Sequence, residues 1–472
     1  MIILGTNSIK DTGYDVANSV RFNSGDSPDM LKNLSDGSRT KWTFSTWFKR
    51  SKISSTQYLF RTIKDGNSGN YTYLQLNSSD QLRYLDYTSG NNAELKTNRL
   101  FRDVSAWYHV CLIIDTTDGT AGDRQQMYIN GVRETSFASS SNYSSSFNTE
   151  MNVANYKFNI GYDGDNSGSY YDGYLAETVF LDGTDEAIGS FGEFDSDSPT
   201  IWKPIDVSGL SGSKGTNGFY LDYEDSSNLG NDVFGGTDFT ETNLAAIDQS
   251  TDTCTNNFCT MNPLDNYWQG STFANGNNTV TTVASKENYN TSTLAIPSND
   301  AGKYYCEVKI VSASAYSQIG LADKLTTSAT DNFKNHAYGY AYDGATGNIL
   351  NNDSGSSYGN SYTTDDIIGI AVDTDNNKLY FSKNGTFQNS GDPTSGATGT
   401  GAISLSATTT NGYYMFASGT RHNDSLQVSW NFGSPPFAIS SGNADANGYG
   451  NFEYAVPSGY YSLNTKNLSE YG

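Results

Sequence analysis

One stretch of the chain constrains the fold more than any other: residues 364–387, with the sequence TDDIIGIAVDTDNNKLYFSKNGTF. Apolar residues recur at every second position in it, first as Ile368, Ile370 and Val372 and then as Leu379 and Phe381. A period of two places such residues on one face of a strand, and residues 373–377 and the pair Asn384-Gly385 are typical of tight turns. The stretch therefore predicts three consecutive antiparallel strands.

A second stretch upstream repeats this design. Its alternating apolar residues are Val110, Leu112 and Ile114, followed after a polar loop by Met127 and Ile129. The pair Asn130-Gly131 then repeats the hairpin turn. Short strands with polar turns and no long helical period are typical of sandwiches. We expect an all-β chain with two β-sandwich domains joined by an irregular bridging region.

Length and charge limit the classes of function. The 472 residues suggest two to four domains, at about 100–200 residues each. The 28 Lys and Arg against 51 Asp and Glu give a net charge of −23, which repels nucleic acid and anionic membranes. No apolar run approaches the roughly 18 residues of a membrane helix, so we expect no membrane insertion. Aromatic residues make up 13% of the chain and supply packed cores, so the high charge does not indicate disorder.

The cysteines and the N-terminus bear on where the protein works. Four cysteines, at positions 111, 254, 259 and 306, are too few and too scattered for a disulfide framework, and we expect free thiols. The first residues, MIILGTNSIKD, lack the basic start of a secretory signal. We expect a protein with a surface suited to the exterior to leave its cell by lysis.

Several phrases of the sequence, taken in order, resemble known families. WTFSTWFKR, SAWYHVCLIID, MYINGV, FNIGY and DGYLAETVFLDG resemble the laminin-G/concanavalin-like lectin jelly roll over residues 15–190. KYYCEVKI, IGLAD, IIGIAVDTDNNKLYFSKNG and VSWNFG resemble the SPRY family over residues 265–438. The resemblances imply two jelly-roll-like binding domains, preceded by an N-terminal arm at 1–14 and followed by a tail at 439–472.

The bridging region, 191–264, and the tail carry a different resemblance. WKP, NGFYLDY, DFTETNLAA and TNNFCTMNPL resemble a bridging region of tail-fibre-like structural proteins of marine bacteriophages. The resemblance implies a virion structural protein, a fibre, spike or surface decoration, whose partners are other virion proteins and a host-surface glycan. It also implies synthesis in the host cytoplasm and release by lysis. The alternatives are a glycan-cleaving enzyme of the concanavalin-like fold and a secreted bacterial adhesin.

The enzyme alternative requires a pair of carboxyl groups. Glu193, Asp195 and Asp197 fit a period of two, and a retaining glycosidase needs two carboxyls about 5–5.5 Å apart. These residues stand in a stretch rich in Gly, Ser and Pro, which indicates a solvated linker. The three histidines, at 109, 336 and 422, lie in different elements. The sequence therefore predicts a protein that is not an enzyme, with no catalytic residue.

Calcium is the one cofactor that the sequence suggests. Asp163 and Asp165 stand in DGDNSG, which copies the first half of an oxygen-ligand loop. The laminin-G resemblance adds Asp115 and Asp118, whose loop is comparable to those that hold calcium in some relatives. The alternative for Asp115 and Asp118 is that they cap a turn.

Tyrosines give the candidate ligand site. Tyr338, Tyr340 and Tyr342 fall on one face of a strand, and with Tyr358 they predict an aromatic platform for a sugar ring or a peptide. The alternative is packing inside the sandwich, since the SPRY resemblance places the first three on a structural strand.

Apolar residues in the bridging region and the tail lack strand spacing and still need burial. They are Phe219, Tyr220, Phe234, Phe258, Met261, Phe452, Tyr454 and Tyr460. Burial against the sandwiches or against a neighbouring chain satisfies that need. We expect a homo-oligomer, a trimer if the protein belongs to a fibre or spike.

Overall fold

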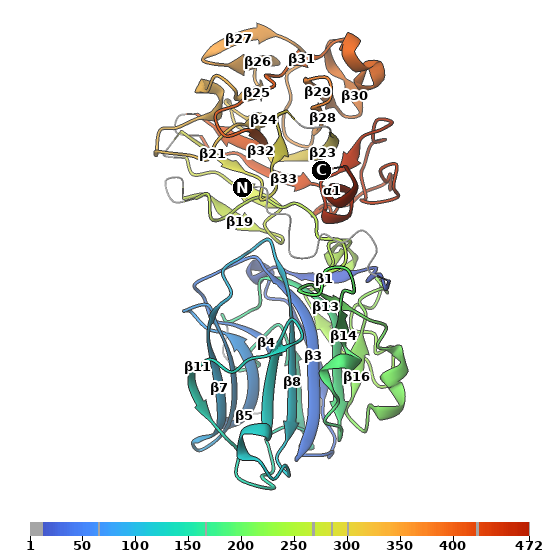
Figure 1. Ribbon diagram of the computed structural model, residues 1–472. Coiled ribbons are helices and arrows are strands. Elements are labelled where there is room, and N and C mark those ends of the chain that lie inside the picture. The colour runs from blue at the N-terminus through green and yellow to red at the C-terminus, as the bar shows by residue number, and fades with distance from the viewer. Residues whose placement is uncertain are drawn as a thin grey trace. The chain divides into compact units, whose positions relative to one another are not determined.

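The structure, a computed structural model, describes residues 13–64, 67–165, 168–266, 270–284, 287–299, 302–421 and 424–471. It divides into two compact units, Asp11–Thr255 and Asn256–Gly472. Regular structure is almost entirely β-strand in both (Figure 1), which confirms the predicted all-β class with two sandwich domains. Most of the predicted N-terminal arm, residues 1–12, lies outside the described residues.

The first unit is built from two large antiparallel sheets. The first sheet runs, in spatial order, through β10 (Val132–Arg133), β9 (Gln125–Ile129), β8 (Trp107–Asp115), β3 (Lys41–Arg50), β13 (Gly173–Asp182), β1 (Ser19–Phe22) and β18 (Gln249–Ser250), with β16 (Phe219–Leu221) paired to β13. The second sheet runs through β11 (Phe137–Ser141), β7 (Asn91–Leu100), β6 (Gln81–Thr88), β5 (Asn67–Leu76), β4 (Gln57–Lys64), β12 (Tyr156–Ile160), β2 (Asp29–Asn33) and β17 (Thr240–Thr242).

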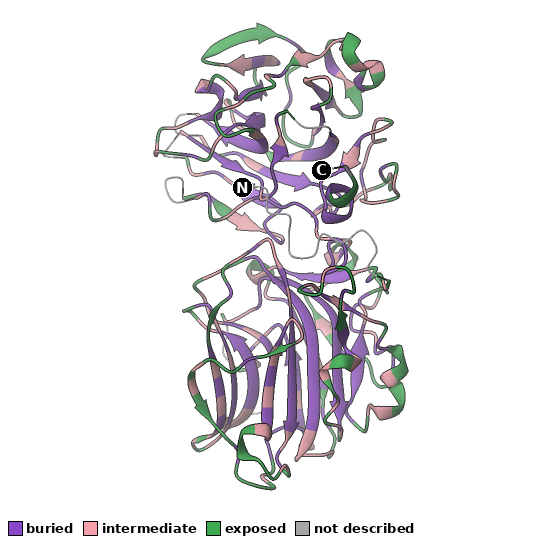
Figure 2. Ribbon diagram, viewed as in Figure 1, coloured by how far each residue is buried: buried purple, intermediate pink, exposed green. Residues whose placement is uncertain are grey.

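The inner faces of these sheets enclose an aromatic core. Phe44 of β3 meets Phe60 of β4 with ring centroids 4.5 Å apart, and Trp42 meets Tyr84 of β6 at 5.9 Å. All four side chains are at most 1% exposed. Burying each contributes about 1.5–3 kcal/mol, so the core holds the two sheets together (Figure 2).

The predicted upstream hairpin is confirmed in the first sheet. β8 pairs with β9 so that Leu112 lies opposite Met127, and β9 turns back into β10. The turn residues Asn130 and Gly131 have φ of 48° and 75°. Both values fall in the left-handed region that an Asn-Gly hairpin turn requires.

The bridging region, for which the sequence predicted an irregular structure, adds strands to this sandwich. β16 pairs with β13, β17 pairs with β2, and β18 pairs with β1. Its residues Tyr220 and Phe234 pack on Cys111, Val179 and Leu181, which lie on the outer face of the first sheet. The boundary between the compact units falls at Thr255–Asn256, inside the predicted region 191–264.

The second unit is also built from two sheets. One runs through β19 (Thr272–Ala274), β20 (Thr279–Thr281), β33 (Gln427–Asn431), β23 (Lys303–Ser312), β28 (Ile367–Asp373), β29 (Lys378–Lys383) and β30 (Thr386–Phe387), with β31 (Ile403–Ser404) on β29 and β34 (Tyr461–Ser462) on β23. The other runs through β21 (Asn288–Thr291), β32 (Tyr413–Thr420), β24 (Gln318–Ala322), β25 (Tyr340–Asp343), β26 (Asn348–Asn351) and β27 (Ser354–Ser357), with β22 (Ile296–Pro297) on β32.

The three strands predicted in residues 364–387 are present as β28, β29 and β30. β28 and β29 pair antiparallel with Ile370 opposite Phe381, and β29 then pairs with β30. Asn384 and Gly385 have φ of 50° and 80°, as the predicted hairpin turn requires.

The C-terminal tail packs on its own unit. Glu307 of β23 accepts hydrogen bonds from the backbone N–H groups of Glu453 and Tyr454, at 2.9 and 2.8 Å. β34 lies parallel to β23, and the tail ends in α1 (Thr465–Tyr471). The Glu307 carboxyl group is therefore a buried attachment point for the tail.

The apolar residues expected to need a cover are mostly buried within their own chain. Tyr454 is half-buried. The other seven are at most 8% exposed: Phe219, Tyr220, Phe234, Phe258, Met261, Phe452 and Tyr460. Burial against the sandwiches accounts for them, so their burial gives no support to a homo-oligomer. All four cysteines are buried free thiols, as predicted. Among the described residues, no helix has the length and apolar character that a membrane span requires.

Candidate functional site

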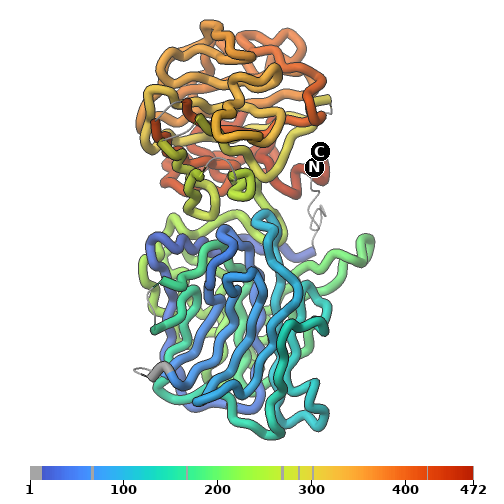
Figure 3. Tube along the Cα trace, turned by 90° about the vertical axis from the view of Figure 1, so that its left-hand side faces the viewer, coloured from blue at the N-terminus to red at the C-terminus, as the bar shows by residue number. Residues whose placement is uncertain are grey.

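A row of tyrosines lies on the outer face of the second sheet of the first unit. Along β5, Leu74 and Leu76 point into the core, so Tyr71 and Tyr73, at odd positions, point to the opposite face. Tyr87 of β6 lies on the same face, directly opposite Tyr71. Figure 3 shows the blue to cyan strands of this sheet side by side. We call Tyr58, Tyr71, Tyr73 and Tyr87 the tyrosine ladder.

The rings of the tyrosine ladder form one continuous series. Tyr58 meets Tyr73 edge to face with centroids 5.3 Å apart, and Tyr73 stacks on Tyr71 at 5.7 Å with 12° between the ring planes. Tyr71 stacks in turn on Tyr87 at 4.9 Å and 6°. Each contact lies in the range of favourable aromatic pairs, so neighbouring rings restrict one another's orientation.

Three of the four tyrosines of the ladder are partly exposed. Within the described part of the chain, none of the four phenol groups makes a hydrogen bond. Tyr58, Tyr71 and Tyr87 are half-buried, and Tyr73 is 5% exposed. Burial raises the pKa of Tyr58 and of Tyr71, so both hydroxyls stay protonated at neutral pH and can donate as well as accept.

Two arginines complete this face. The Arg61 guanidinium carbon of β4 lies 4.6 Å from the ring centroid of Tyr71 and 5.8 Å from that of Tyr58. The guanidinium carbon of Arg83, in β6, lies 5.7 Å from the ring centroid of Tyr73, and Arg83 Nε forms an ion pair of 2.6 Å with Glu94. Such cation–π contacts fix the guanidinium groups against the rings.

The sequence reasoning did not single out the ladder. Its signal is the pair Tyr71 and Tyr73 at period two, together with Arg83, Leu85 and Tyr87 at the same period. The intervening positions of both strands are core residues. Two facing strands with an aromatic and basic outer face thus predict a binding surface only once their pairing is known.

Asp115 and Asp118 do not fit a calcium ion. Asp115 Oδ2 forms an ion pair of 2.7 Å with Lys41, and its Oδ1 accepts the backbone N–H of Thr117 at 2.9 Å. Burial raises the pKa of Asp115, but Lys41 and Thr117 outweigh it, so the pKa is lowered overall. Asp118 Oδ1 accepts the backbone N–H of Thr120 at 2.6 Å. Turn capping, the expected alternative, describes both residues.

Asp163 and Asp165 adjoin the ladder. Asp163 is 2% exposed, its Oδ1 accepts the backbone N–H of Asp165 at 3.2 Å, and its carbonyl oxygen accepts Arg61 Nη1 at 2.8 Å. The next loop residues, 166–167, lie outside the described residues. Among the residues that are described, no group of three His, Cys, Asp or Glu side chains is arranged to hold a metal. Calcium at this loop stays a prediction.

The four tyrosines predicted as a ligand platform lie mostly in the core of the second unit. Tyr342 is fully buried and stacks on Phe381 with centroids 5.1 Å apart. Tyr340 and Tyr358 are 7% and 8% exposed, and Tyr338 is a half-buried residue packed on the same core. The expected alternative, packing inside the sandwich, describes their positions. The four residues do not form a shared exposed platform, because β25 turns the rings of Tyr340 and Tyr342 inward.

The sequence indicated a solvated linker for the carboxylates considered for glycan cleavage. The structure instead places them inside the first compact unit. Glu193 lies in β14 (Gly192–Phe194), which pairs with β15 (Trp202–Pro204). Lys203 of β15 forms ion pairs with Glu193 at 3.3 Å and with Asp195 at 3.4 Å. The backbone N–H of Ser198 and then Lys203 lower the pKa of Asp195, which is the opposite of what a general acid needs.

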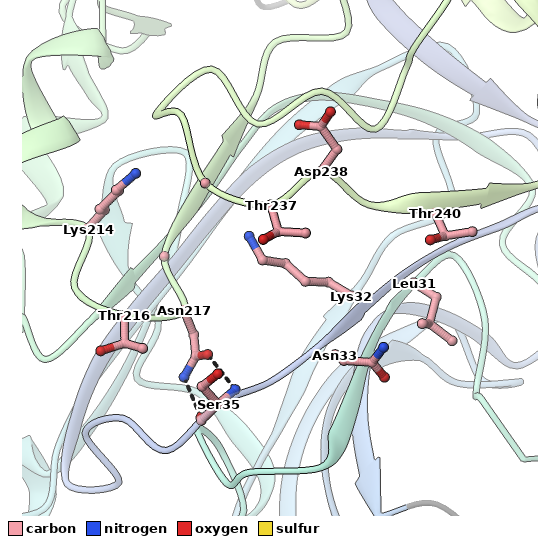
Figure 4. Close-up of a pocket in the computed structure, with 12 residues that line it drawn as sticks. Leu31, Lys32, Asn33, Ser35, Lys214, Thr216, Asn217, Thr237, Asp238 and Thr240 are labelled. Carbon is pink, nitrogen blue, oxygen red and sulfur yellow. Dashed lines mark hydrogen bonds between the residues drawn. The ribbon is translucent and has the colours of Figure 1, made fainter.

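A polar cavity of about 340 Å³ lies beside β2 and β17 (Figure 4). Asn217 and Ser35 on its wall exchange two hydrogen bonds of 2.8 Å. Lys32 is buried and forms an ion pair of 3.3 Å with Asp232; burial lowers the pKa of Lys32, and Asp232 opposes that shift. The cavity offers hydroxyl and amide groups to a small polar molecule, but its buried lysine is already paired.

Two parts of the chain match known families. Residues 23–184 match the family described as the concanavalin A-like lectin/glucanases superfamily, and residues 303–408 match the SPRY domain. The chain carries a lectin-like domain and a SPRY domain. The tyrosine ladder lies within the first matched range, and the predicted Tyr338, Tyr340, Tyr342 and Tyr358 lie within the second.

Individual proteins share only part of the chain. Ran-binding protein 9 of Danio rerio is 37% identical over 87 residues, which are 18% of this chain and 14% of that protein. Ran-binding protein 9 of Homo sapiens is 38% identical over 87 residues, 18% of this chain and 12% of that protein. The match thus spans less than a sixth of either relative.

Solved structures give weaker likenesses. The SPRY domain of human HERC1 has a TM-score of 0.29 and 15% identity, over 36% of this chain and 96% of that one. Domains LG4-5 of the mouse laminin alpha1 chain have a TM-score of 0.31 and 9% identity, over 89% of this chain and 88% of that one.

Proposed function

We propose that the protein is a non-enzymatic carbohydrate-binding protein and that its lectin-like domain binds a glycan chain along the tyrosine ladder. One observation carries the proposal. Four tyrosines in continuous ring contact lie on the outer face of a lectin-like sheet, and their hydroxyls have no partner within the described residues.

The geometry suits a sugar for two physical reasons. A pyranose ring presents an apolar face of C–H groups, which packs on an aromatic ring and removes apolar area from water. Its hydroxyls need hydrogen-bond partners once they are desolvated, and the free phenol groups supply donors and acceptors. Three strands contribute to the series, so it offers successive subsites for an extended chain rather than one enclosed pocket.

The experiment is affinity electrophoresis and calorimetry with a panel of neutral and acidic polysaccharides and with extracted host-surface glycan. We expect Tyr71→Ala to weaken binding roughly 5- to 30-fold, since a central interface tyrosine contributes about 1–2 kcal/mol. Tyr338→Ala is the matched control, because that residue is the least buried of the four tyrosines predicted from the sequence. Unchanged binding by Tyr71→Ala, or loss with Tyr338→Ala alone, would move the site to the SPRY domain.

We propose further that the protein is a structural component of a phage particle, a fibre, spike or surface decoration, that contacts other virion proteins and a host glycan. The support is the sequence resemblance of the bridging region and the tail to tail-fibre-like proteins, together with the net charge of −23, which suits an exposed surface. Mass spectrometry of purified particles tests this. A gene located in a bacterial secretion locus, and particles that lack the protein, would favour the secreted adhesin.

A further inference from the structure

Arg61 stands out among the buried cations of the first unit. It is 7% exposed, yet it forms no ion pair with any described residue. Its Nη1 donates to the carbonyl oxygen of Asp163 at 2.8 Å, while its buried Nε has no hydrogen-bond partner. A buried guanidinium group without an anion is costly, because it gives up hydration without an equivalent partner.

Two other buried cations of the same unit have an acidic partner. Lys49 pairs with Asp252 at 2.7 Å, and Arg50 pairs with Asp80 at 3.0 Å. A chain with 51 acidic residues supplies such partners readily. The missing carboxylate at Arg61 is therefore a specific feature of this face.

The position of Arg61 couples it to the ladder. In the register of the sheet it lies opposite Tyr73, and its guanidinium group lies over the ring of Tyr71 at 4.6 Å. Its Nη2 makes no hydrogen bond with a described residue and, unlike Nε, is not fully buried. The neighbouring Arg83 is already paired with Glu94, so the unmet charge on this face belongs to Arg61.

We propose that the glycan bound along the ladder is acidic and that Arg61 binds the carboxylate or sulfate group of one of its sugars. This rests on the proposed glycan-binding function and adds the class of ligand. A guanidinium group donates two parallel N–H bonds to a two-oxygen anion, which gives orientation as well as affinity. The sugar ring that carries the anion then lies against the ladder beside Tyr71, whose own ring contacts Tyr87 and Arg61.

The experiment compares ligands that differ only in charge. Polygalacturonate and its fully methyl-esterified form share one backbone, and ι-carrageenan beside agarose supplies the sulfate arm. We expect the wild-type protein to bind at least one acidic member roughly 10- to 100-fold more tightly than its neutral counterpart. The arm that shows the difference identifies carboxylate or sulfate as the group.

Variants assign the preference to a residue. Arg61→Gln should weaken binding of the acidic member more than binding of the neutral one, so that the preference between the two members is lost. Arg61→Lys keeps the positive charge but cannot donate two parallel N–H bonds, so we expect an intermediate loss of the preference for the acidic member. This variant replaces Arg61→Gln in the test if Arg61→Gln does not fold. Arg133→Gln is the control for charge, since Arg133 lies in β10 of the other sheet, where it forms an ion pair with Asp123.

Each outcome bears on one claim. Equal binding of both members of each pair, lost in Tyr71→Ala and kept in Arg61→Gln, overturns the acidic class and leaves the glycan-binding function intact. A preference for the acidic member that persists in Arg61→Gln and Arg61→Lys overturns the role of Arg61. Binding to no glycan of the panel, with Tyr71→Ala indistinguishable from the wild type, overturns both proposals.

Discussion

We expect the lectin-like unit to become less stable as the pH rises through neutrality, because the carboxyl group of Glu177 is buried. Glu177 lies in β13 where the register shifts between Ala176 and Val179, with φ of 50°, and it is 5% exposed. Its carboxyl group accepts the hydroxyls of Tyr220 at 2.8 Å and Tyr14 at 3.3 Å. It forms no ion pair with a described residue, so ionisation places an uncompensated charge in the protein interior.

The sign follows from the pKa. Burial, with smaller contributions from Asp222 and Glu224, raises the pKa of Glu177 from 4.5 to about 8, although the two tyrosine hydroxyls oppose the shift. The folded state thus binds this proton more tightly than the unfolded state does. The stabilisation is fully present below about pH 4.5 and is lost progressively up to about pH 8. At 1.36 kcal/mol per pH unit, the loss is roughly 3 kcal/mol between pH 5 and pH 8.

The assay is urea unfolding at half-unit steps from pH 5 to pH 8.5, followed by tryptophan fluorescence. Glu177→Gln cannot ionise and keeps an acceptor for the tyrosine hydroxyls, so its free energy of unfolding should fall less steeply than that of the wild type, by roughly 3 kcal/mol over this range. Glu193→Gln is the control, because Glu193 is 59% exposed and should follow the wild type. Parallel curves for Glu177→Gln and the wild type would refute the reasoning.

Three further predictions test the remaining expectations. Asp115→Asn should cost at most about 1 kcal/mol and leave any calcium response of the melting temperature unchanged, because its carboxylate pairs with Lys41; loss of a calcium response in this variant would contradict the fit argument. Incubation with bound polysaccharides should release no reducing ends, and release that Glu193→Gln abolishes would favour the enzyme alternative. Truncation after Ala438 should destabilise the SPRY unit, because it removes the Glu453 and Tyr454 N–H groups that donate to Glu307. Light scattering of the intact chain decides between a monomer and a trimer.

The strands with strict alternation were predictable because local sequence determines them. In β28 and β29, the period of two and the turn at residues 373–377 fix both the strands and their pairing. The same holds for β8 and β9. β28 and β29 are seven and six residues long, and β8 and β9 are nine and five, which is long enough for the alternation to be recognised.

The bridging strands were not predictable for a related reason. β16 and β17 are three residues long, and β18 is two. Such segments have no periodicity of their own, and they become strands because β13, β2 and β1 offer free edges to them. Their structure is determined by tertiary contacts, which no local pattern encodes.

The candidate tyrosines were misjudged because alternation identifies a face but not its direction. Tyr340 and Tyr342 share one face of β25, while Tyr338 precedes the strand, and the shared face is turned inward, with Tyr342 packed against Phe381 in the core. In β5 the residues of the other parity, Leu74 and Leu76, fill the core, and Tyr71 and Tyr73 are left outside. Which face is inner depends on the opposing sheet, so sequence alone did not decide between a platform and a core.

The two outer faces of the lectin-like sandwich carry different residues, and this difference supports a binding role for one of them. The first sheet has Cys111, Val179 and Leu181 outside, and the bridging region covers them. The second sheet has tyrosines and arginines outside, and among the described residues the ladder hydroxyls have no hydrogen-bond partner and the Arg61 guanidinium has no acidic partner. A face that served only folding would be covered in the same way or carry paired charges. The side chains on the second sheet instead keep hydrogen-bonding and ionic capacity that a ligand can satisfy.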